Sequence, residues 1–203
     1  MAPEAVLVLG DSVPGGAVTP ATAWPRRVAD RAGAALHTRG SMGTTMVDLA
    51  DWTAAALREA LPGEDREGTP GGSGGGTVAL VHAGHNDAQL RGDEPRVDES
   101  EFRAAARTVD ERLTDAAAVD RHAFLGLVPL LSLASDGVSF SDAQPDRSLD
   151  YDRALGETVS THLPVARPVE AWRERTADGV HPNEAGHAAL ADQVTAWLEN
   201  GQL

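Results

Sequence analysis

Apolar residues follow two patterns along the chain. Short continuous apolar runs, typical of buried strands, occur at residues 5–9, 34–38, 78–82, 123–129 and, less regularly, 164–169. Between them, apolar residues recur every three or four positions, as on one face of a helix, in residues 49–60, 102–117 and 190–198. Strands that alternate with helices pair in parallel through crossovers. The pattern therefore predicts an α/β fold: a three-layer α/β/α sandwich around a mostly parallel five-stranded sheet.

Two segments interrupt this alternation within what we predict to be a single domain spanning residues 1–203. Residues 62–77 are charged and then rich in glycine, which predicts a flexible surface loop. Its glycines precede a strand and do not have the G-x-G-x-x-G spacing, so they do not indicate a dinucleotide site. Residues 131–147 form a long predicted loop before a helix that starts near Ser148, and loops of this length often contribute to function.

Charge and composition narrow the partners that the protein can have. The formal net charge of −14, from 17 basic and 31 acidic residues, repels nucleic-acid backbones and anionic membranes. There is no cysteine, and the N-terminal segment has neither the basic region nor the cleavage site of a signal peptide. No apolar run reaches the roughly 20 residues that span a bilayer. We expect a cytoplasmic protein with a small-molecule partner and no nucleic-acid or membrane partner; the oligomeric state is not encoded in these patterns.

Four polar stretches follow predicted strands or precede the last helix. In a parallel sheet, the carboxyl ends of the strands meet at one edge, where ligands bind. Ser12 follows the first strand, and a serine hydroxyl becomes a nucleophile when a base takes its proton. Asp178 and His181 stand three residues apart, so the carboxylate can orient the imidazole as that base. Backbone N–H groups of Ser12 and Gly43, with the Asn86 amide, can donate to a developing oxyanion.

The four stretches resemble, in order, the four sequence blocks of the SGNH hydrolases, the GDSL esterase and lipase superfamily. The blocks are "GDSVPGG" with Ser12, "TRGSMGTT" with Gly43, "GHND" with Asn86 and "DGVHPN" with Asp178 and His181. The resemblance implies the flavodoxin-like SGNH hydrolase fold. It also implies catalytic Ser12, Asp178 and His181, and an oxyanion hole made by Ser12, Gly43 and Asn86.

Some positions depart from the family pattern or have more than one interpretation. Thr38 stands where the glycine block usually begins with asparagine, and Gly40 competes with Gly43 for the oxyanion position. We assign Gly40 and His85 as candidates for the substrate pocket; the "GHND" form resembles that of some carbohydrate acetylesterases. His82 and His85 lack a clear third ligand, so we expect no metal and no cofactor. Asp11 and Asp87 are interpreted as structural.

The sequence therefore predicts a serine esterase that forms an acyl-enzyme on Ser12. The favoured substrate is an O-acyl ester, short-chain or acetyl, of a small molecule or carbohydrate. An acyltransferase would use the same acyl-enzyme with a hydroxyl acceptor in place of water, and nothing in the sequence separates the two. A non-catalytic binding module is the third alternative.

Overall fold

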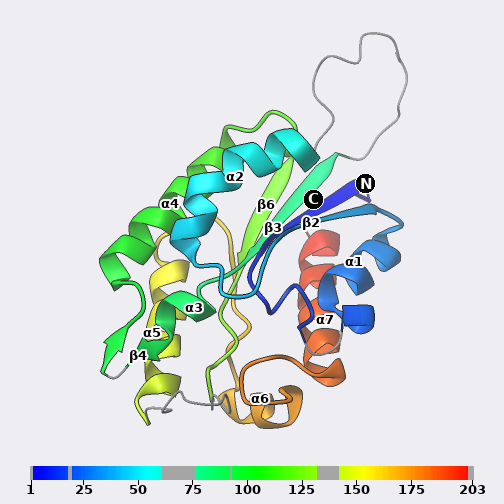
Figure 1. The fold of residues 1–203 in the computed structure, drawn as a ribbon. Helices are drawn as coiled ribbons and strands as arrows, with labels where there is room; N and C mark the ends of the chain where they lie inside the picture. The colour runs from blue at the N-terminus through cyan, green and yellow to red at the C-terminus, as the bar shows by residue number, and fades with distance from the viewer. Residues whose placement is uncertain (1, 18–19, 61–75, 92, 132–141, 201–203) are drawn as a thin grey trace, which may run out of the picture.

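The computed structural model, which describes residues 2–17, 20–60, 76–91, 93–131 and 142–200, contains one five-stranded sheet (Figure 1). All neighbouring strands pair in parallel, in the order β2-β1-β3-β6-β7. The strands are β1 (Ala5–Gly10), β2 (Ala35–Gly40), β3 (Thr77–His82), β6 (Arg121–Leu125) and β7 (His162–Leu163). The predicted α/β fold with a parallel five-stranded sheet is confirmed.

Helices cover both faces of the sheet (Figure 1). One face carries α2 (Met46–Ala60), α4 (Glu99–Thr114) and α5 (Gln144–Gly156). The other carries α1 (Trp24–Ala32) and α7 (Glu184–Asn200). Short elements complete the chain: η1 (Pro20–Thr22), α3 (His85–Ala88), the hairpin β4 (Leu90–Arg91) and β5 (Glu94–Pro95), and α6 (Val169–Arg175).

The two apolar cores follow from the alternation of side chains along the strands. In β1, Leu7 and Leu9 face the core shared with α2, α4 and α5, whereas Val6 and Val8 face the core shared with α1 and α7. All four side chains are buried, because a parallel sheet between two helical layers has no solvent face. None of the helices in the described ranges has the length and apolar content needed to cross a bilayer.

Several predicted boundaries were wrong. The strand predicted at residues 164–169 lies earlier, at His162–Leu163, and α6 begins at Val169. Prolines at positions 164 and 168 explain this shift, because proline has no N–H to donate to a strand ladder. The fourth strand begins at Arg121 and ends at Leu125, and the helix predicted to start near Ser148 begins at Gln144. The predicted loop at residues 62–77 lies almost wholly outside the described residues, as do residues 132–141 of the long loop.

The strand register places the loops after β1, β2 and β3 at one edge. Gly10 is paired with Gly40 on β2 and with His82 on β3. Gly40 has φ +138°, and a Cβ there would overlap the carbonyl oxygen of Gly10. Glycine at position 40 therefore allows the ends of β1 and β2 to approach closely.

Candidate active site

Ser12, His181 and Asp178 form a continuous hydrogen-bonded series at this edge. The Oγ of Ser12, just beyond β1, lies 3.0 Å from Nε2 of His181, in the loop before α7. Nδ1 of the same ring lies 2.6 Å from Oδ2 of Asp178. Because a carboxylate only accepts hydrogen bonds, Nδ1 carries the proton and Nε2 is free to accept one from Ser12. The structure thus brings the three predicted catalytic residues together in the geometry of a nucleophile, a base and an orienting carboxylate.

Asp178 is fixed in its charged form by its own loop. Its Oδ1 accepts hydrogen bonds from the backbone N–H groups of Val180, at 2.9 Å, and His181, at 2.7 Å. Partial burial acts to raise the pKa of Asp178, but the hydrogen bonds from His181 and Val180 outweigh burial and lower this pKa below 3.8. The carboxylate is therefore ionised wherever the imidazole can act as a base.

The predicted oxyanion donors Gly43 and Asn86 line the same pocket as Ser12. Gly43 has φ +84°, a conformation that favours glycine, and one N–H of the Asn86 amide donates to the carbonyl oxygen of Thr44 at 3.0 Å. The second N–H of Asn86 makes no hydrogen bond to any described residue. In the described part of the chain, the backbone N–H groups of Ser12 and Gly43 also lack an acceptor. Three donors without a partner among the described residues therefore belong to residues that line this pocket.

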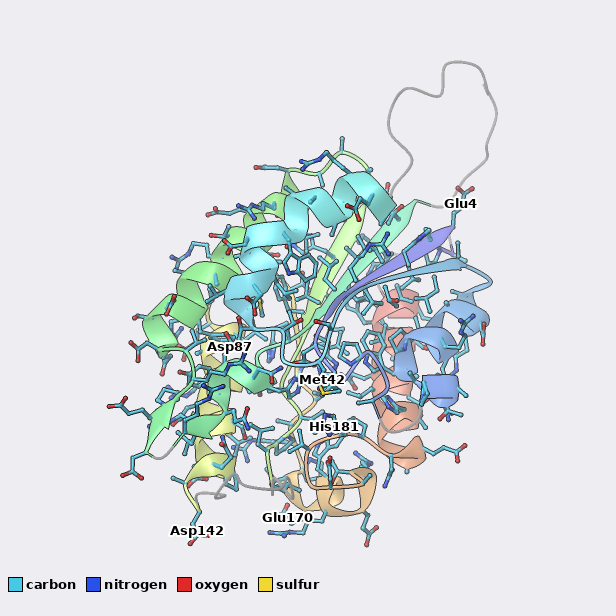
Figure 2. All side chains as sticks on the ribbon, viewed as in Figure 1. Glu4, Met42, Asp87, Asp142, Glu170 and His181 are labelled. Atoms are coloured by element: carbon cyan, nitrogen blue, oxygen red, sulfur yellow. The ribbon has the colours of Figure 1, made fainter. Side chains whose placement is uncertain are left out.

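A pocket of about 250 Å³ lies against Ser12, His181 and Asp178. Its lining combines the polar residues with an apolar wall and comprises Ser12, Met42, Gly43, His85, Asn86, Gln89, Leu130, Asp178, Val180 and His181. Met42, which lies near His181 in Figure 2, is 81% exposed and is the large apolar side chain that the described surface leaves uncovered. Gly40, the other candidate for the substrate pocket, is not among these lining residues and lies at the contact between β1 and β2.

A family model of the GDSL-like lipases and acylhydrolases matches residues 8–189, from β1 into α7. The chain belongs to this family. This GDSL-family protein is a carboxylic ester hydrolase, and the match spans all four of its sequence blocks. No curated protein matches the sequence.

Solved structures with this fold are similar over nearly their full length. An α/β hydrolase from the metagenome of Lake Arreo, Spain, has a TM-score of 0.69 and 16% identity, covering 97% of this chain and 95% of that one. An acetylxylan esterase from Geobacillus stearothermophilus has a TM-score of 0.67 and 17% identity, covering 96% and 94%. A GDSL-like lipase from Bacteroides thetaiotaomicron has a TM-score of 0.67 and 13% identity, covering 98% and 89%. At sequence identities of 13–17%, the structural similarity establishes a shared fold and nothing more specific.

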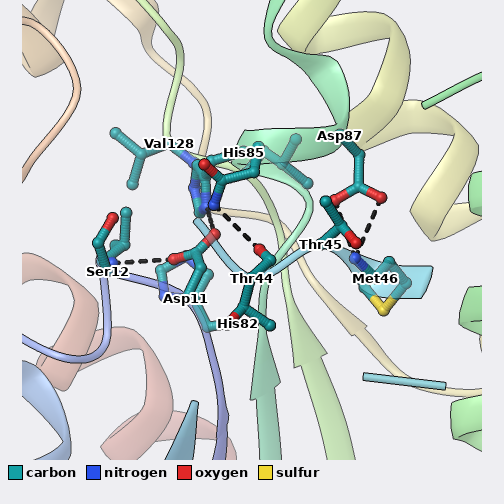
Figure 3. Close-up of polar contacts among 12 residues, drawn as sticks. Asp11, Ser12, Thr44, Thr45, Met46, His82, His85, Asp87 and Val128 are labelled. Atoms are coloured by element: carbon teal, nitrogen blue, oxygen red, sulfur yellow. Dashed lines mark hydrogen bonds and ion pairs between the residues drawn. The ribbon is translucent and has the colours of Figure 1, made fainter. Parts of the chain in front are cut away.

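In this GDSL-family hydrolase, a buried network braces the nucleophile turn, the turn at residues 11–13 that carries the predicted nucleophile Ser12 (Figure 3). Oδ1 of Asp11 accepts a hydrogen bond from the backbone N–H of Val13 at 2.8 Å, and Oδ2 lies 2.8 Å from Nδ1 of His85. Nε2 of His85 accepts a hydrogen bond from the backbone N–H of Val128 at 2.9 Å. His85 is therefore neutral, with its proton on Nδ1. His85 is among the residues that line the pocket, and both of its ring nitrogens are bonded within the protein.

His82 also makes structural contacts. Its Nε2–H donates to the carbonyl oxygen of Gly126 at 3.1 Å, and its ring lies edge-on to that of His85, with centroids 5.0 Å apart. Burial, followed by the nearby His85, lowers the pKa of His82 well below 6.5, so that the ring is neutral. Across the described ranges, no three histidine, aspartate or glutamate side chains are grouped so that they could hold a metal ion.

Two buried titratable groups should change the stability of this hydrolase with pH in opposite directions. Burial raises the pKa of Asp87 to about 7, and burial, with a smaller effect of Arg27, lowers the pKa of His187 to about 4. The stability that Asp87 contributes is full below its unfolded pKa, near 3.8, and is lost as pH rises through about 7. The stability that His187 contributes is full above pH 6.5 and is lost as pH falls through about 4.

We expect single variants to separate these two effects. From pH 4 to pH 7, Asp87→Asn should gain stability over the wild type, by at most roughly 4 kcal/mol. From pH 6.5 to pH 4, His187→Asn should gain stability over the wild type, by at most roughly 3 kcal/mol. Denaturant unfolding of all three proteins at half-unit pH steps measures both differences. A constant difference across the pH range would show that the group has the same pKa in the folded and unfolded protein.

Proposed function

We propose that this hydrolase removes a short acyl group, preferably acetyl, from an O-acyl ester of a small molecule or carbohydrate. His181 takes the proton of Ser12 as Oγ attacks the acyl carbonyl carbon. The carbonyl oxygen becomes an oxyanion, held by the N–H groups of Ser12 and Gly43 and by the Asn86 amide. His181 then returns the proton to the leaving alcohol, and an acyl-enzyme remains on Ser12. Water, deprotonated by His181, releases the acid and restores the serine.

The observation that supports this reaction most directly is the Ser12–His181–Asp178 series on a small pocket. The atom separations of 3.0 and 2.6 Å are those needed for proton transfer to a base held by a carboxylate. His181 and Asp178 both stand in the loop before α7, so a single loop presents the base and its orienting carboxylate.

The size and lining of the pocket support a small ester substrate. Its volume of about 250 Å³ is below the roughly 300–1,000 Å³ of pockets that enclose drug-sized ligands. Met42, Leu130 and Val180 offer apolar contact, while the Gln89 amide, which makes no hydrogen bond with the described residues, can bind a polar alcohol group. Two structural neighbours are described as acetylxylan esterases, which supports a carbohydrate-type ester.

Hydrolysis of p-nitrophenyl acetate, butyrate and octanoate tests the chain length. We expect kcat/KM to be highest for the acetate and at least about 100-fold lower for the octanoate, because a misfit of even one methylene costs about 10- to 200-fold. A preference for octanoate would contradict the short-acyl proposal.

Addition of sugar alcohols to the acetate reaction, with product analysis, distinguishes hydrolysis from acyl transfer. If sugar acetates were the main product, the protein would be an acyltransferase and not an esterase.

A further inference from the structure

Successive side chains of the single-turn helix α3 reach different neighbours (Figure 3). His85 bonds to the nucleophile turn through Asp11, as described above. The next two residues, Asn86 and Asp87, both bond to the segment 43–46, which contains the oxyanion donor Gly43 and the start of α2.

The hydrogen bond between Asp87 and Met46 is buried, and both carboxylate oxygens lie within bonding distance of one N–H group. The Asp87 carboxylate has no exposed surface, and Oδ1 and Oδ2 lie 3.0 and 2.9 Å from the backbone nitrogen of Met46. That N–H is at the first residue of α2, where a helix offers no internal acceptor and favours negative charge. A carboxylate therefore suits the position electrostatically, although its burial is costly.

Helix α2 also has a local cap that does not involve Asp87. The backbone N–H of Thr45 donates to Oδ2 of Asp48 at 2.8 Å, and the N–H of Asp48 donates to Oγ1 of Thr45 at 3.1 Å. This reciprocal pair satisfies the helix end from within α2 and its preceding residue. The additional bond from Asp87 connects the helix end to α3, 41 residues away in sequence.

We propose that Asp87 is a positioning residue for the oxyanion hole: by holding Met46, it fixes the backbone of the Gly43 loop relative to Ser12 and Asn86. The inference rests on the oxyanion role of Gly43 in the proposed function. Asn86 and Asp87 hold the segment at two points, the carbonyl oxygen of Thr44 and the N–H of Met46. Loss of the second point lets Gly43 move relative to the reacting carbonyl oxygen. A displacement of about 1 Å in such a group can cost about 100-fold in rate.

The experiment compares Asp87→Ala, Asp87→Asn and the matched control Asp48→Asn at pH 8. All three variants change a carboxylate that bonds to the start of α2, but Asp48 is exposed and does not connect α2 to α3. The measurements are kcat and KM for p-nitrophenyl acetate, the affinity of a small alkyl boronic acid, and the rate of Ser12 labelling by a fluorophosphonate. A boronate bound to Ser12 mimics the tetrahedral intermediate, so its affinity reports the oxyanion hole.

We expect Asp87→Ala to lower kcat about 10- to 100-fold with KM within about twofold, and to weaken boronate binding by a similar factor. Asp87→Asn keeps an acceptor for the N–H of Met46 and should recover most of this loss. Asp48→Asn should retain wild-type kcat. Equal losses in Asp48→Asn and Asp87→Ala, in proportion to lost stability, would overturn the proposal and leave Asp87 as a helix cap.

Two further measurements keep the proposal testable if Asp87→Ala does not fold. Amide hydrogen exchange of the wild type should show a protected Met46 N–H; rapid exchange there would remove the anchor on which the proposal depends. Fluorophosphonate labelling does not depend on the natural ester. A wild type that labels but does not prefer acetate overturns the short-acyl function alone, whereas a folded wild type that never labels overturns both proposals.

Discussion

Ser12→Ala should lower kcat/KM for p-nitrophenyl acetate by roughly 10⁴- to 10⁶-fold, and His181→Ala by nearly as much. The reason is that the two groups perform one step. Without its base at 3.0 Å, the Ser12 hydroxyl attacks poorly, and without the hydroxyl, the base has no proton to take. The double variant should therefore be scarcely slower than either single variant. The activity that remains reflects binding and the oxyanion donors.

Steady-state kinetics of the two single variants and the double variant measure this coupling, and thermal melting shows whether each is folded. Ser100→Ala is a matched control, because Ser100 is an exposed serine on α4 and should leave kcat/KM unchanged. If the two losses multiplied in the double variant, Ser12 and His181 would act in separate steps, and the acyl-enzyme mechanism would not describe this site.

Asn86→Ala should lower kcat about 10²- to 10³-fold, with a much smaller change in KM. The amide donates one N–H to Thr44 and keeps the other available at the pocket. Alanine removes the donor where negative charge develops, which affects the transition state more than the bound ester. It also leaves the carbonyl oxygen of Thr44 without this hydrogen bond, so some loss of stability accompanies the kinetic effect.

Gln89→Ala provides the contrast for this prediction. Gln89 carries the same amide group and lines the same pocket, three residues further along the chain. An amide that binds the alcohol part of the ester should alter KM for a sugar ester more than kcat for p-nitrophenyl acetate. If Asn86→Ala and Gln89→Ala had the same kinetic profile, Asn86 would be a binding residue and not an oxyanion donor.

The sequence predicted the fold and grouped the site residues for a definite physical reason. Buried strands produce continuous apolar runs, and parallel strands bring their carboxyl ends to one edge. Ser12, Gly43 and Asn86 follow three such strands, so finding the strands was sufficient to group these residues. The local pair Asp178 and His181 could be recognised from its spacing alone.

The contacts that hold the site together could not be predicted in this way. Asp11 and Asp87 were interpreted as structural, but their partners could not be identified from spacing. Met46 lies 41 residues before Asp87, and the partner of His85 on the other side is a backbone N–H at Val128. A backbone donor leaves no signal in side-chain composition, and its partner is known only when the loops are placed in space.

Helix α3 tolerates fewer sequence changes than the rim of the pocket does. One turn of helix serves both the nucleophile turn and the oxyanion loop, so any insertion or rotation there would alter both at once. Met42, Leu130 and Val180 come from three separate loops and make no side-chain hydrogen bond, so each can be exchanged individually. New substrate ranges should therefore arise by substitution at the rim of the pocket, while the segment that carries the chemistry changes as a block or not at all.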